Sequence, residues 1–163
     1  MQIRAFDPAD TEPVVALWHE CGLTRPWNDP HRDIERKLAV QPELFLVGTE
    51  LVEPRAAEGD GDGDGASDGT DGGSTEEVLV ATAMAGHDGH RGWLWYVAVA
   101  PGHRGGGRAR QIVAEAERLL TEAGCPKVML MVRSGNDAAA ATWGGLGYEP
   151  DDVAVYGKRL IAD

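Results

Sequence analysis

The feature that most constrains the fold of this chain is a glycine-rich turn that joins an apolar strand to an amphipathic helix. The strand, Val97-Ala98-Val99, runs into a Pro-Gly turn, and three consecutive glycines follow at 105–107. Apolar residues then recur from Ala109 to Ala123 with the i, i+3, i+4, i+7 spacing of a helix packed on a sheet. A glycine-rich turn that opens a helix leaves backbone N–H groups at the positive end of the helix dipole, where anions bind. The stretch therefore predicts a cradle for a diphosphate.

Length and charge limit the classes of protein to which the chain can belong. Its 163 residues are enough for one domain with its own core, so we expect 1–163 to form a single domain. The net charge of −12 argues against nucleic acid as a partner. No apolar run approaches the roughly 20 residues that span a bilayer, and the N-terminus has no signal-peptide pattern. We therefore expect a cytoplasmic protein with no membrane partner.

The two cysteines give no sign of a metal centre or of nucleophilic chemistry. Cys21 and Cys125 lie far apart in the sequence and match no metal-ligand spacing. We expect both to be reduced thiols without a catalytic part, and we expect no metal.

A low-complexity acidic segment interrupts the middle of the chain. Residues 53–77 hold nine acidic residues and one basic residue, among many Gly and Ser. Such a composition cannot bury enough apolar surface to offset the cost of ordering, so a disordered hairpin loop is expected. The spacing of acidic residues over 60–71 also matches a calcium-binding loop, but that loop normally lies between two helices and this segment lies between two strands. A solvated acidic linker is therefore the favoured interpretation.

The pattern of apolar residues predicts an α/β (α+β) fold. The expected order is β-α-α-β-β-β-α-β-α-β, with a mixed, mostly antiparallel central sheet flanked by helices. The five apolar residues at 128–132 are typical of a strand buried on both faces. Repeated βαβ units and a Gly-Lys-Ser/Thr sequence are both missing, which excludes a Rossmann fold and a nucleotide P-loop. The predicted strands are 1–5, 44–52, 78–85, 93–99, 128–132 and 153–160, and the predicted helices are 7–22, 29–40, 109–123 and 136–146.

The element order and the glycine turn together resemble the GNAT-type N-acetyltransferases. The phosphate turn of that family reads Arg or Gln, two residues, Gly, one residue, then Gly or Ala, and Arg104, Gly107 and Ala109 fill these places. The blocks 25–30, 33–37, 88–92, 124–127 and 157–161 resemble segments of small bacterial acetyltransferases, so the likeness covers nearly the whole chain except 53–77.

The resemblance implies a co-substrate and a set of residues that bind it. It implies acetyl-CoA as the acetyl donor, with a direct transfer of the acetyl group to a primary amine of a small molecule, peptide or protein. The strand before the turn pairs with pantetheine in the family, and the N–H groups of the turn hold the diphosphate. The residues implied to bind the cofactor are Val97, Ala98, Val99, Arg104, Gly105, Gly106, Gly107, Arg108, Ala109 and Asn136.

One family position differs in this chain, and it bears on the handling of a proton. The segment that begins at Asn136 matches the family at Ala139, Gly147 and Tyr148, but Trp143 stands where the family has a Tyr. That Tyr is usually assigned as the acid that protonates the departing CoA thiolate. An indole N–H can donate a hydrogen bond but does not release a proton usefully. Trp143 therefore remains a candidate for assisting the thiolate by hydrogen bonding only.

The other candidate catalytic residues lie on and before the strand 93–99. The N–H of Val99 is the candidate donor to the oxyanion, and such a donor is effective because it is fixed where charge develops. Asp88, His90 and His87, in the turn before the strand, are candidate bases, with an ordinary polar turn as the alternative.

Three further residues are candidates for lining the amine pocket: Arg25, Trp27 and Tyr96. Because successive strand residues alternate between faces, only one of Trp95 and Tyr96 is expected to point into that pocket. Two rival functions stay open. One is a catalytically weak module of the same fold that senses acyl-CoA, and the other is transfer of a longer acyl group. The resemblance also allows a homodimer.

Overall fold

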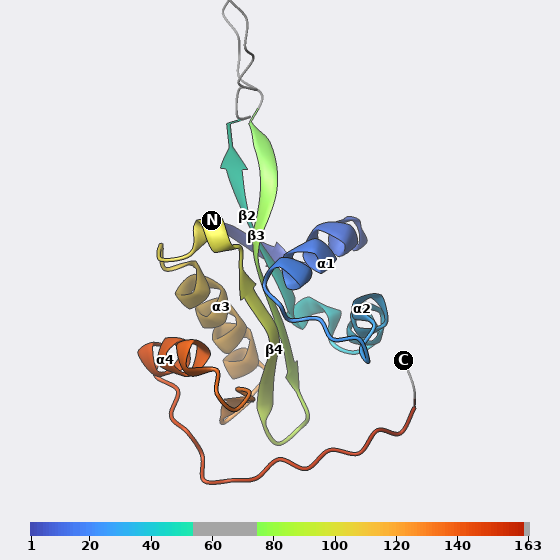
Figure 1. Cartoon of the computed structure of the whole chain (residues 1–163), viewed down its shortest axis with the longest axis vertical. Coiled ribbons are helices and arrows are strands. Elements are labelled where there is room, and N and C mark those ends of the chain that lie inside the picture. Colours follow the sequence, from blue (N-terminus) through green and yellow to red (C-terminus); the bar gives the residue numbers. More distant parts are fainter. Residues whose placement is uncertain (54–74, 162–163) are drawn as a thin grey trace, which may run out of the picture.

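The computed structural model describes residues 1–53 and 75–161 and consists of a five-stranded sheet with helices on both faces (Figure 1). The strands lie side by side in chain order, and neighbours are antiparallel except for the last pair, which is parallel. The predicted α/β class with a mixed, mostly antiparallel sheet is confirmed. The elements are β1 (Gln2–Ala5), η1 (Pro8–Asp10), α1 (Thr11–Glu20), α2 (Pro30–Leu38), η2 (Pro42–Leu44), β2 (Phe45–Val52), β3 (Glu76–His87), β4 (Gly92–Val99), η3 (Pro101–His103), α3 (Arg108–Glu122), β5 (Val128–Leu130) and α4 (Asp137–Gly145).

Two apolar cores lie on opposite faces of the sheet. Helices α1 and α2 cover one face, where Trp18 and Phe45 are fully buried. Helix α3 covers the other face with Ile112 and Leu120, which are also fully buried. The amphipathic pattern that predicted α3 therefore reports a real sheet-facing stripe. In Figure 1 the sheet separates α1 and α2 from α3 and α4. None of the described helices is long and apolar enough to cross a bilayer.

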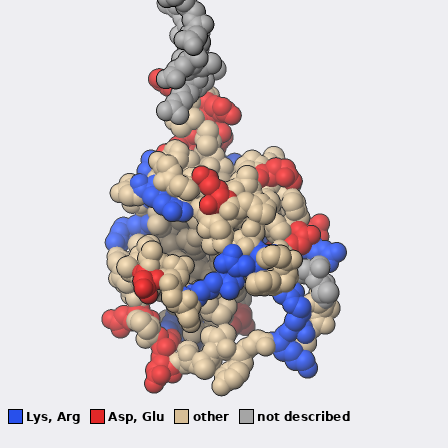
Figure 2. Space-filling model, viewed as in Figure 1, with Lys and Arg blue, Asp and Glu red and all other residues tan. Residues whose placement is uncertain are grey.

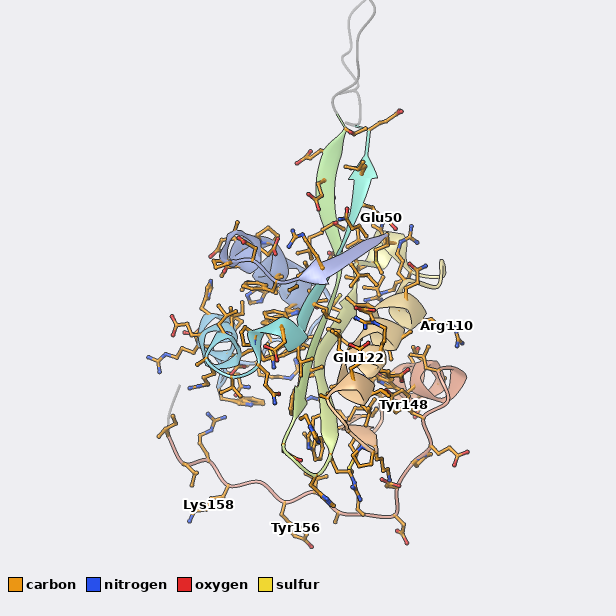
Figure 3. The ribbon with its side chains drawn as sticks, turned by 180° about the vertical axis from the view of Figure 1, so that it is seen from behind. Glu50, Arg110, Glu122, Tyr148, Tyr156 and Lys158 are labelled. Carbon is orange, nitrogen blue, oxygen red and sulfur yellow. The ribbon has the colours of Figure 1, made fainter. Side chains whose placement is uncertain are left out.

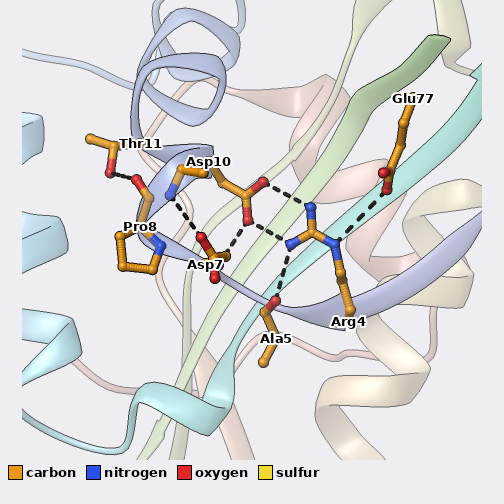
Figure 4. Close-up of polar contacts among 8 residues, drawn as sticks. Arg4, Ala5, Asp7, Pro8, Asp10, Thr11 and Glu77 are labelled. Carbon is orange, nitrogen blue, oxygen red and sulfur yellow. Dashed lines mark hydrogen bonds and ion pairs between the residues drawn. The ribbon is translucent and has the colours of Figure 1, made fainter.

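A polar cluster fixes the start of α1 to the edge strand of the sheet. Arg4 of β1 donates to both oxygens of Asp10, at 2.6 and 2.8 Å, and Asp10 also accepts the N–H of Asp7 (Figure 4). Asp7 in turn accepts the N–H of Ala9, which completes a capping box. These contacts hold the pKa of Asp10 below its usual range, chiefly through the hydrogen bond from Arg4, against the opposing effect of burial.

A bulge interrupts β4 at Tyr96. The register passes from Met84 opposite Trp95 to Thr82 opposite Ala98, so β4 holds one more residue than β3 over this interval. Tyr96 takes a positive φ of 48°, a conformation that costs strain for a bulky side chain. The extra residue places Trp95 and Tyr96 on the same face of the sheet. The expectation that Trp95 and Tyr96 point to opposite faces was wrong because strict alternation fails at a bulge.

The strands β4 and β5 part after a short paired region. Their register runs only from Gly92 opposite Val128 to Leu94 opposite Leu130. The predicted strand over 128–132 is therefore too long, and Met131 is 56% exposed rather than buried on both faces. Along the described chain no strand pairs with the outer edge of β5, so burial on both faces is not reached. The rest of β4 is left with a gap on its far side.

The predicted closing strand at 153–160 is also wrong. In the described part of this segment the backbone is extended but belongs to no sheet, and Val153, Tyr156 and Leu160 are 65%, 93% and 85% exposed. It runs from α4 past the end of the sheet toward α2 (Figure 1). Its apolar alternation is a local signal, whereas a strand forms only when a partner edge is in reach.

The acidic segment falls largely outside the described residues. The strands that flank it pair as predicted, up to Val52 opposite Glu76, so the hairpin of β2 and β3 is confirmed. The loop predicted at 53–77, with the calcium-type spacing over 60–71, lies outside the described residues except at its two ends.

Candidate active site

The end of β4 presents its main chain to the gap left by β5. The N–H of Ala100 donates to the Val80 carbonyl of β3 at 2.9 Å. Because main-chain groups alternate in direction along an antiparallel strand, the N–H and C=O of Val99 point away from β3, into the gap. The Val99 carbonyl accepts from Nε of Arg104 at 3.0 Å and from Sγ of Cys21 at 3.5 Å. Val99 thus has the orientation that an oxyanion donor requires.

The glycine turn follows directly and opens α3. Gly105 and Gly107 have φ values of 81° and 76°, in the left-handed region that favours glycine. Gly107 is the N-cap of α3, no side chain caps the helix, and the described first turn contains no acidic residue. The first N–H groups of α3 therefore keep their positive potential. Free N–H groups at a helix N-terminus are a geometry that can accept an anion, and the diphosphate cradle stays a prediction.

Arg108 locks this turn to the sheet. Its guanidinium donates to the two oxygens of Glu50 on β2, at 2.7 and 2.9 Å, and to the carbonyl of His103 at 2.9 Å. The hydrogen bond from Arg108, helped by a second one from His103, lowers the pKa of Glu50 to about 2. In Figure 3 Glu50 lies beside the start of α3. Arg108 therefore shapes the anion site, and much of its charge is neutralised by Glu50.

The remaining basic residues of the turn have different tasks. Arg104 lies at the end of β4, where its Nε donates to the Val99 carbonyl. Arg110 donates to the Gly145 carbonyl at 2.7 Å and so ties α3 to α4. On the face that presents β4, basic side chains form a belt beside a hollow (Figure 2), although the whole chain has a net charge of −12. The local potential therefore suits an anionic ligand better than the overall charge suggests.

The segment after β5 contributes packing and caps. The side chain of Asn136 accepts the N–H of Ala139 at 3.2 Å and caps α4. Trp143 packs edge-on against Tyr148, with ring centroids 5.1 Å apart. The Tyr148 hydroxyl donates to Glu117 of α3 at 2.7 Å, and burial together with Glu117 raises the pKa of Tyr148 (Figure 3). Tyr148 is therefore a poor acid, and it cannot take the role of the Tyr that the family has at the position of Trp143.

A cavity of about 540 Å³ lies between α2 and the hairpin of β3 and β4. Trp93, Trp95 and Tyr96 line it from β4, and Asp33 and Lys37 line it from α2. The rings of Trp93 and Trp95 stack with centroids 6.3 Å apart, and they form an apolar wall. The cavity reaches β4 at the bulge residue Tyr96, and Val97 and Val99 lie one and three residues further along the strand. The same strand, β4, therefore lines this cavity and presents the main chain of Val99 to the gap beside β5.

Tyr96 is the predicted substrate residue that the structure places in the cavity. Its ring stacks on Trp18 with centroids 3.9 Å apart, and its carbonyl accepts from Oγ1 of Thr82 at 2.8 Å. Thr82 in turn accepts from the indole of Trp18 at 3.0 Å. The Tyr96 hydroxyl donates to Asp33 at 2.7 Å. The strained residue is thus held on both its main chain and its side chain.

The other predicted substrate residues form a separate turn. Arg25 donates to the carbonyls of Gly22 and Thr24, at 2.8 and 2.7 Å, and closes the end of α1. Trp27 sits in the turn between Arg25 and Asn28 and is 56% exposed. Of the described turn residues Arg25, Trp27 and Asn28, only Asn28 lines the cavity.

The candidate bases lie at the tip of the hairpin. Asp88 lines the cavity and accepts the N–H groups of His90 and Arg91 and the indole N–H of Trp93. These bonds, led by the one from Arg91, lower the pKa of Asp88 to about 2. A carboxylate of that pKa is a weak proton acceptor at neutral pH. His90 is exposed at the tip, next to Arg91.

Sequence reasoning missed the α2 wall of the cavity. Asp33 and Lys37 stand four residues apart, which places them on one helix face, but this spacing is also common on solvated helices. Trp93 and Trp95 of β4 line the same cavity. Their place in the cavity depends on the position of α2, for which no local signal exists.

Comparisons with known proteins place the chain in the family that its sequence resembles. The acetyltransferase (GNAT) family pattern matches residues 14–148. An acetyltransferase of Yersinia enterocolitica is 42% identical over 163 residues, which cover 100% of this chain and 98% of that protein. An acetyltransferase of Sodalis glossinidius is 43% identical over 164 residues, with coverage of 100% and 98%.

Solved structures share the fold at lower sequence identity. A putative acetyltransferase from Agrobacterium tumefaciens has a TM-score of 0.66 and 19% identity, and the alignment covers 98% of this chain and 100% of that one. The aminoglycoside N-acetyltransferase AAC(6')-Iy, in complex with a bisubstrate analog, has a TM-score of 0.64 and 20% identity, with 97% of each chain covered.

Proposed function

Because the chain belongs to the GNAT family of acetyltransferases, we propose that it moves an acetyl group from acetyl-CoA directly to a primary amine. The observation that carries this proposal is that β4 presents its main chain to one space and its side chains to another. Its main chain at Val99 faces the gap beside the glycine turn, and its side chain at Tyr96 faces the cavity. A donor held on one side and an amine held on the other would meet at the bulge.

The chain's own groups would hold the donor. The N–H groups from Arg104 to Ala109 would bind the diphosphate, and the main chain of Val97, Ala98 and Val99 would align the pantetheine. The AAC(6')-Iy chain, whose fold is shared, has a structure in complex with CoA, which supports this assignment. Asn136 would act by capping α4. No group of three or more metal-ligating side chains exists in the described residues, and the chemistry proposed needs no metal.

The transfer would proceed by direct attack. The amine nitrogen adds to the thioester carbonyl, and the developing oxyanion is stabilised by the N–H of Val99. The carbon–sulfur bond then breaks and CoA leaves as a thiolate, which is a tolerable leaving group because thiol pKa values lie near 8.5. The ammonium proton passes to water. We do not assign it to Asp88, because its three hydrogen bonds make it a weak acceptor, and His90 stays a weaker candidate at the exposed tip.

An acyl-CoA sensor is the second candidate, and the two functions differ in one measurement. Trp143 and the Glu117-bound Tyr148 leave the thiolate without an obvious acid, which is the observation that favours a sensor. Release of free CoA thiol, measured with acetyl-CoA and a panel of primary amines, would identify an enzyme. Tight CoA binding by calorimetry without thiol release on any amine would identify a sensor. A donor panel from acetyl- to longer acyl-CoA would test acyl length.

Three finer assignments complete the proposal. The segment matches seen in the sequence support a member of the type of small bacterial acetyltransferase called YpeA. The free thiols of Cys21 and Cys125 support a cytoplasmic location. The exposed apolar side chains of 153–161 support a homodimer, which light scattering of the full chain would detect.

A further inference from the structure

The bulge in β4 reverses the direction of the main-chain groups along the strand. At the start of β4 the N–H of Gly92 donates to the Lys127 carbonyl, on the side of β5, at 2.9 Å. Just past its end the N–H of Ala100 donates to the Val80 carbonyl of β3, also at 2.9 Å. Gly92 and Ala100 are eight residues apart, so in a regular strand both N–H groups would point to the same neighbour. The extra residue at the bulge accounts for the reversal.

The direction of the Val99 peptide depends on this reversal. Val99 follows Gly92 by seven residues, so without the bulge its N–H would point to β3 and pair within the sheet. With the bulge its N–H points into the gap beside β5, where the proposed function needs a donor to the oxyanion. The contacts that hold the bulge therefore also orient Val99.

Two buried hydrogen bonds hold the main chain of the bulge from the side of α1. The hydroxyl of Thr82 donates to the Tyr96 carbonyl at 2.8 Å, and the indole N–H of Trp18 donates to the same hydroxyl oxygen at 3.0 Å. Thr82 and Trp18 are both fully buried. The carbonyl can only accept and the indole can only donate, so the hydroxyl proton of Thr82 is directed at Tyr96.

Tyr96 needs such support because of its backbone conformation. Its φ of 48° is rare for a bulky residue and persists only when the surroundings hold it. The stacking of its ring on Trp18 and the hydrogen bond of its hydroxyl to Asp33 hold the side chain. The bond from Thr82 acts on the main chain itself, next to the peptide that leads to Val97.

We propose that Thr82 and Trp18 are positioning residues for the acetyl transfer, which hold the bulge at Tyr96 and so direct the N–H of Val99 into the gap. This inference rests on the proposed function, in which Val99 is the oxyanion donor. The oxyanion develops during the chemical step, whereas the N–H groups proposed to bind the diphosphate lie beyond β4, at 104–109. Loss of the Thr82 hydroxyl should therefore lower kcat more than the affinity for CoA.

Replacement of this hydroxyl by a methyl group tests the proposal. Thr82→Val keeps the shape of the side chain, and we expect kcat for the release of CoA thiol to fall about 10- to 100-fold, as for a misplaced catalytic group. The Kd for CoA, measured by calorimetry, should change less than about threefold. Thr82→Ser keeps the hydroxyl and should restore kcat to within about threefold of the parent. Thr49→Val, at a second buried threonine of the sheet, is the control and should keep kcat.

A second variant answers the same question if Thr82→Val does not fold. In Trp18→Phe the ring can still stack on Tyr96, but the Thr82 hydroxyl loses the donor that orients it. We expect kcat to fall about 3- to 10-fold, with little change in the Kd for CoA. A purely structural role would lower the free energy of unfolding and leave kcat as in Thr49→Val, which would overturn the proposal.

The conformation of Tyr96 separates this inference from the proposed function. Backbone chemical shifts measured by NMR distinguish a left-handed residue from an extended one without any turnover. We expect a left-handed Tyr96 in the parent, in Thr82→Ser and in Thr49→Val, and an extended one in Thr82→Val. If the parent acetylates no amine, the proposed function fails, and the chemical shifts still decide whether Thr82 holds the bulge. A left-handed Tyr96 or a parental kcat in Thr82→Val, or no rescue by Thr82→Ser, would overturn the inference.

Discussion

The contact between Glu50 and Arg108 predicts that the glycine turn is a pH-sensitive element of stability. The pKa of Glu50 falls from 4.5 to about 2, chiefly through the hydrogen bond from Arg108. At about 1.36 kcal/mol per pKa unit this shift corresponds to at most about 3 kcal/mol of folding free energy. The Glu50 side chain is 18% exposed, so solvent screening reduces the expected contribution to about 1–2 kcal/mol.

The direction of the pH dependence follows from the lowered pKa. A carboxyl with a lower pKa in the folded state stabilises the protein above its unfolded pKa and loses that contribution as the pH falls through the folded pKa. Glu50→Gln should therefore lose about 1–2 kcal/mol at pH 7. The difference from the parent should shrink between about pH 5 and pH 2, because the parent carboxylate becomes protonated there.

Urea unfolding at pH 7 and pH 3 measures both effects. Glu122→Gln is the matched control, because Glu122 also pairs with an arginine, Arg118, but is 63% exposed. We expect the control to change the free energy of unfolding by less than about 0.5 kcal/mol at either pH. If Glu50→Gln behaves like the control at both pH values, the anchoring role of Glu50 is refuted.

Three further perturbations test the site and the core. Gly106→Ala should weaken CoA binding about tenfold by calorimetry, because a Cβ there would lie 2.3 Å from Nη1 of Arg108, which donates to the His103 carbonyl, and would displace the guanidinium that fixes the turn. Unchanged affinity would contradict this. If protonation of the thiolate limits the rate, Trp143→Tyr should raise kcat by up to about 10²-fold, the lower limit of what general acids typically contribute. An equal or lower kcat would count against this explanation. Leu120→Ala should lower the free energy of unfolding by about 2–5 kcal/mol, since Leu120 of α3 is fully buried in the core, and a loss below 1 kcal/mol in urea unfolding would show that neighbouring side chains fill the space left.

Local sequence patterns predicted the parts of the fold that depend on local interactions. The periodicity after Ala109 gave α3, and the positive φ values of Gly105 and Gly107 fit the predicted turn. The closing strand at 153–160 was predicted by the same kind of pattern, and it failed. Alternation reports that a segment can pair, but the partner edge depends on contacts between distant segments.

For the candidate site, the sequence carries a local signal for the stretch proposed to bind the donor, but none for the cavity proposed to bind the amine. The proposed donor contacts would use main-chain groups of one continuous stretch, so the spacing of the glycines is enough to suggest them. The cavity depends on a bulge at Tyr96 and on the position of α2, both of which arise from tertiary packing. Even Arg108, expected to face the phosphates, is turned by Glu50, which lies 58 residues away. No local sequence pattern predicts that Arg108 pairs with a residue as distant as Glu50.

The parting of β4 from β5 has a consequence for how this enzyme type can diversify. On β4 the proposed donor contacts would use the peptide backbone of Val97 and Val99, while the side chains of Trp93, Trp95 and Tyr96 line the cavity. Substitutions along the strand can therefore alter the choice of amine while the grip on the cofactor stays constant. Under this proposal, the peptide groups of one strand would bind the donor and its side chains would select the acceptor.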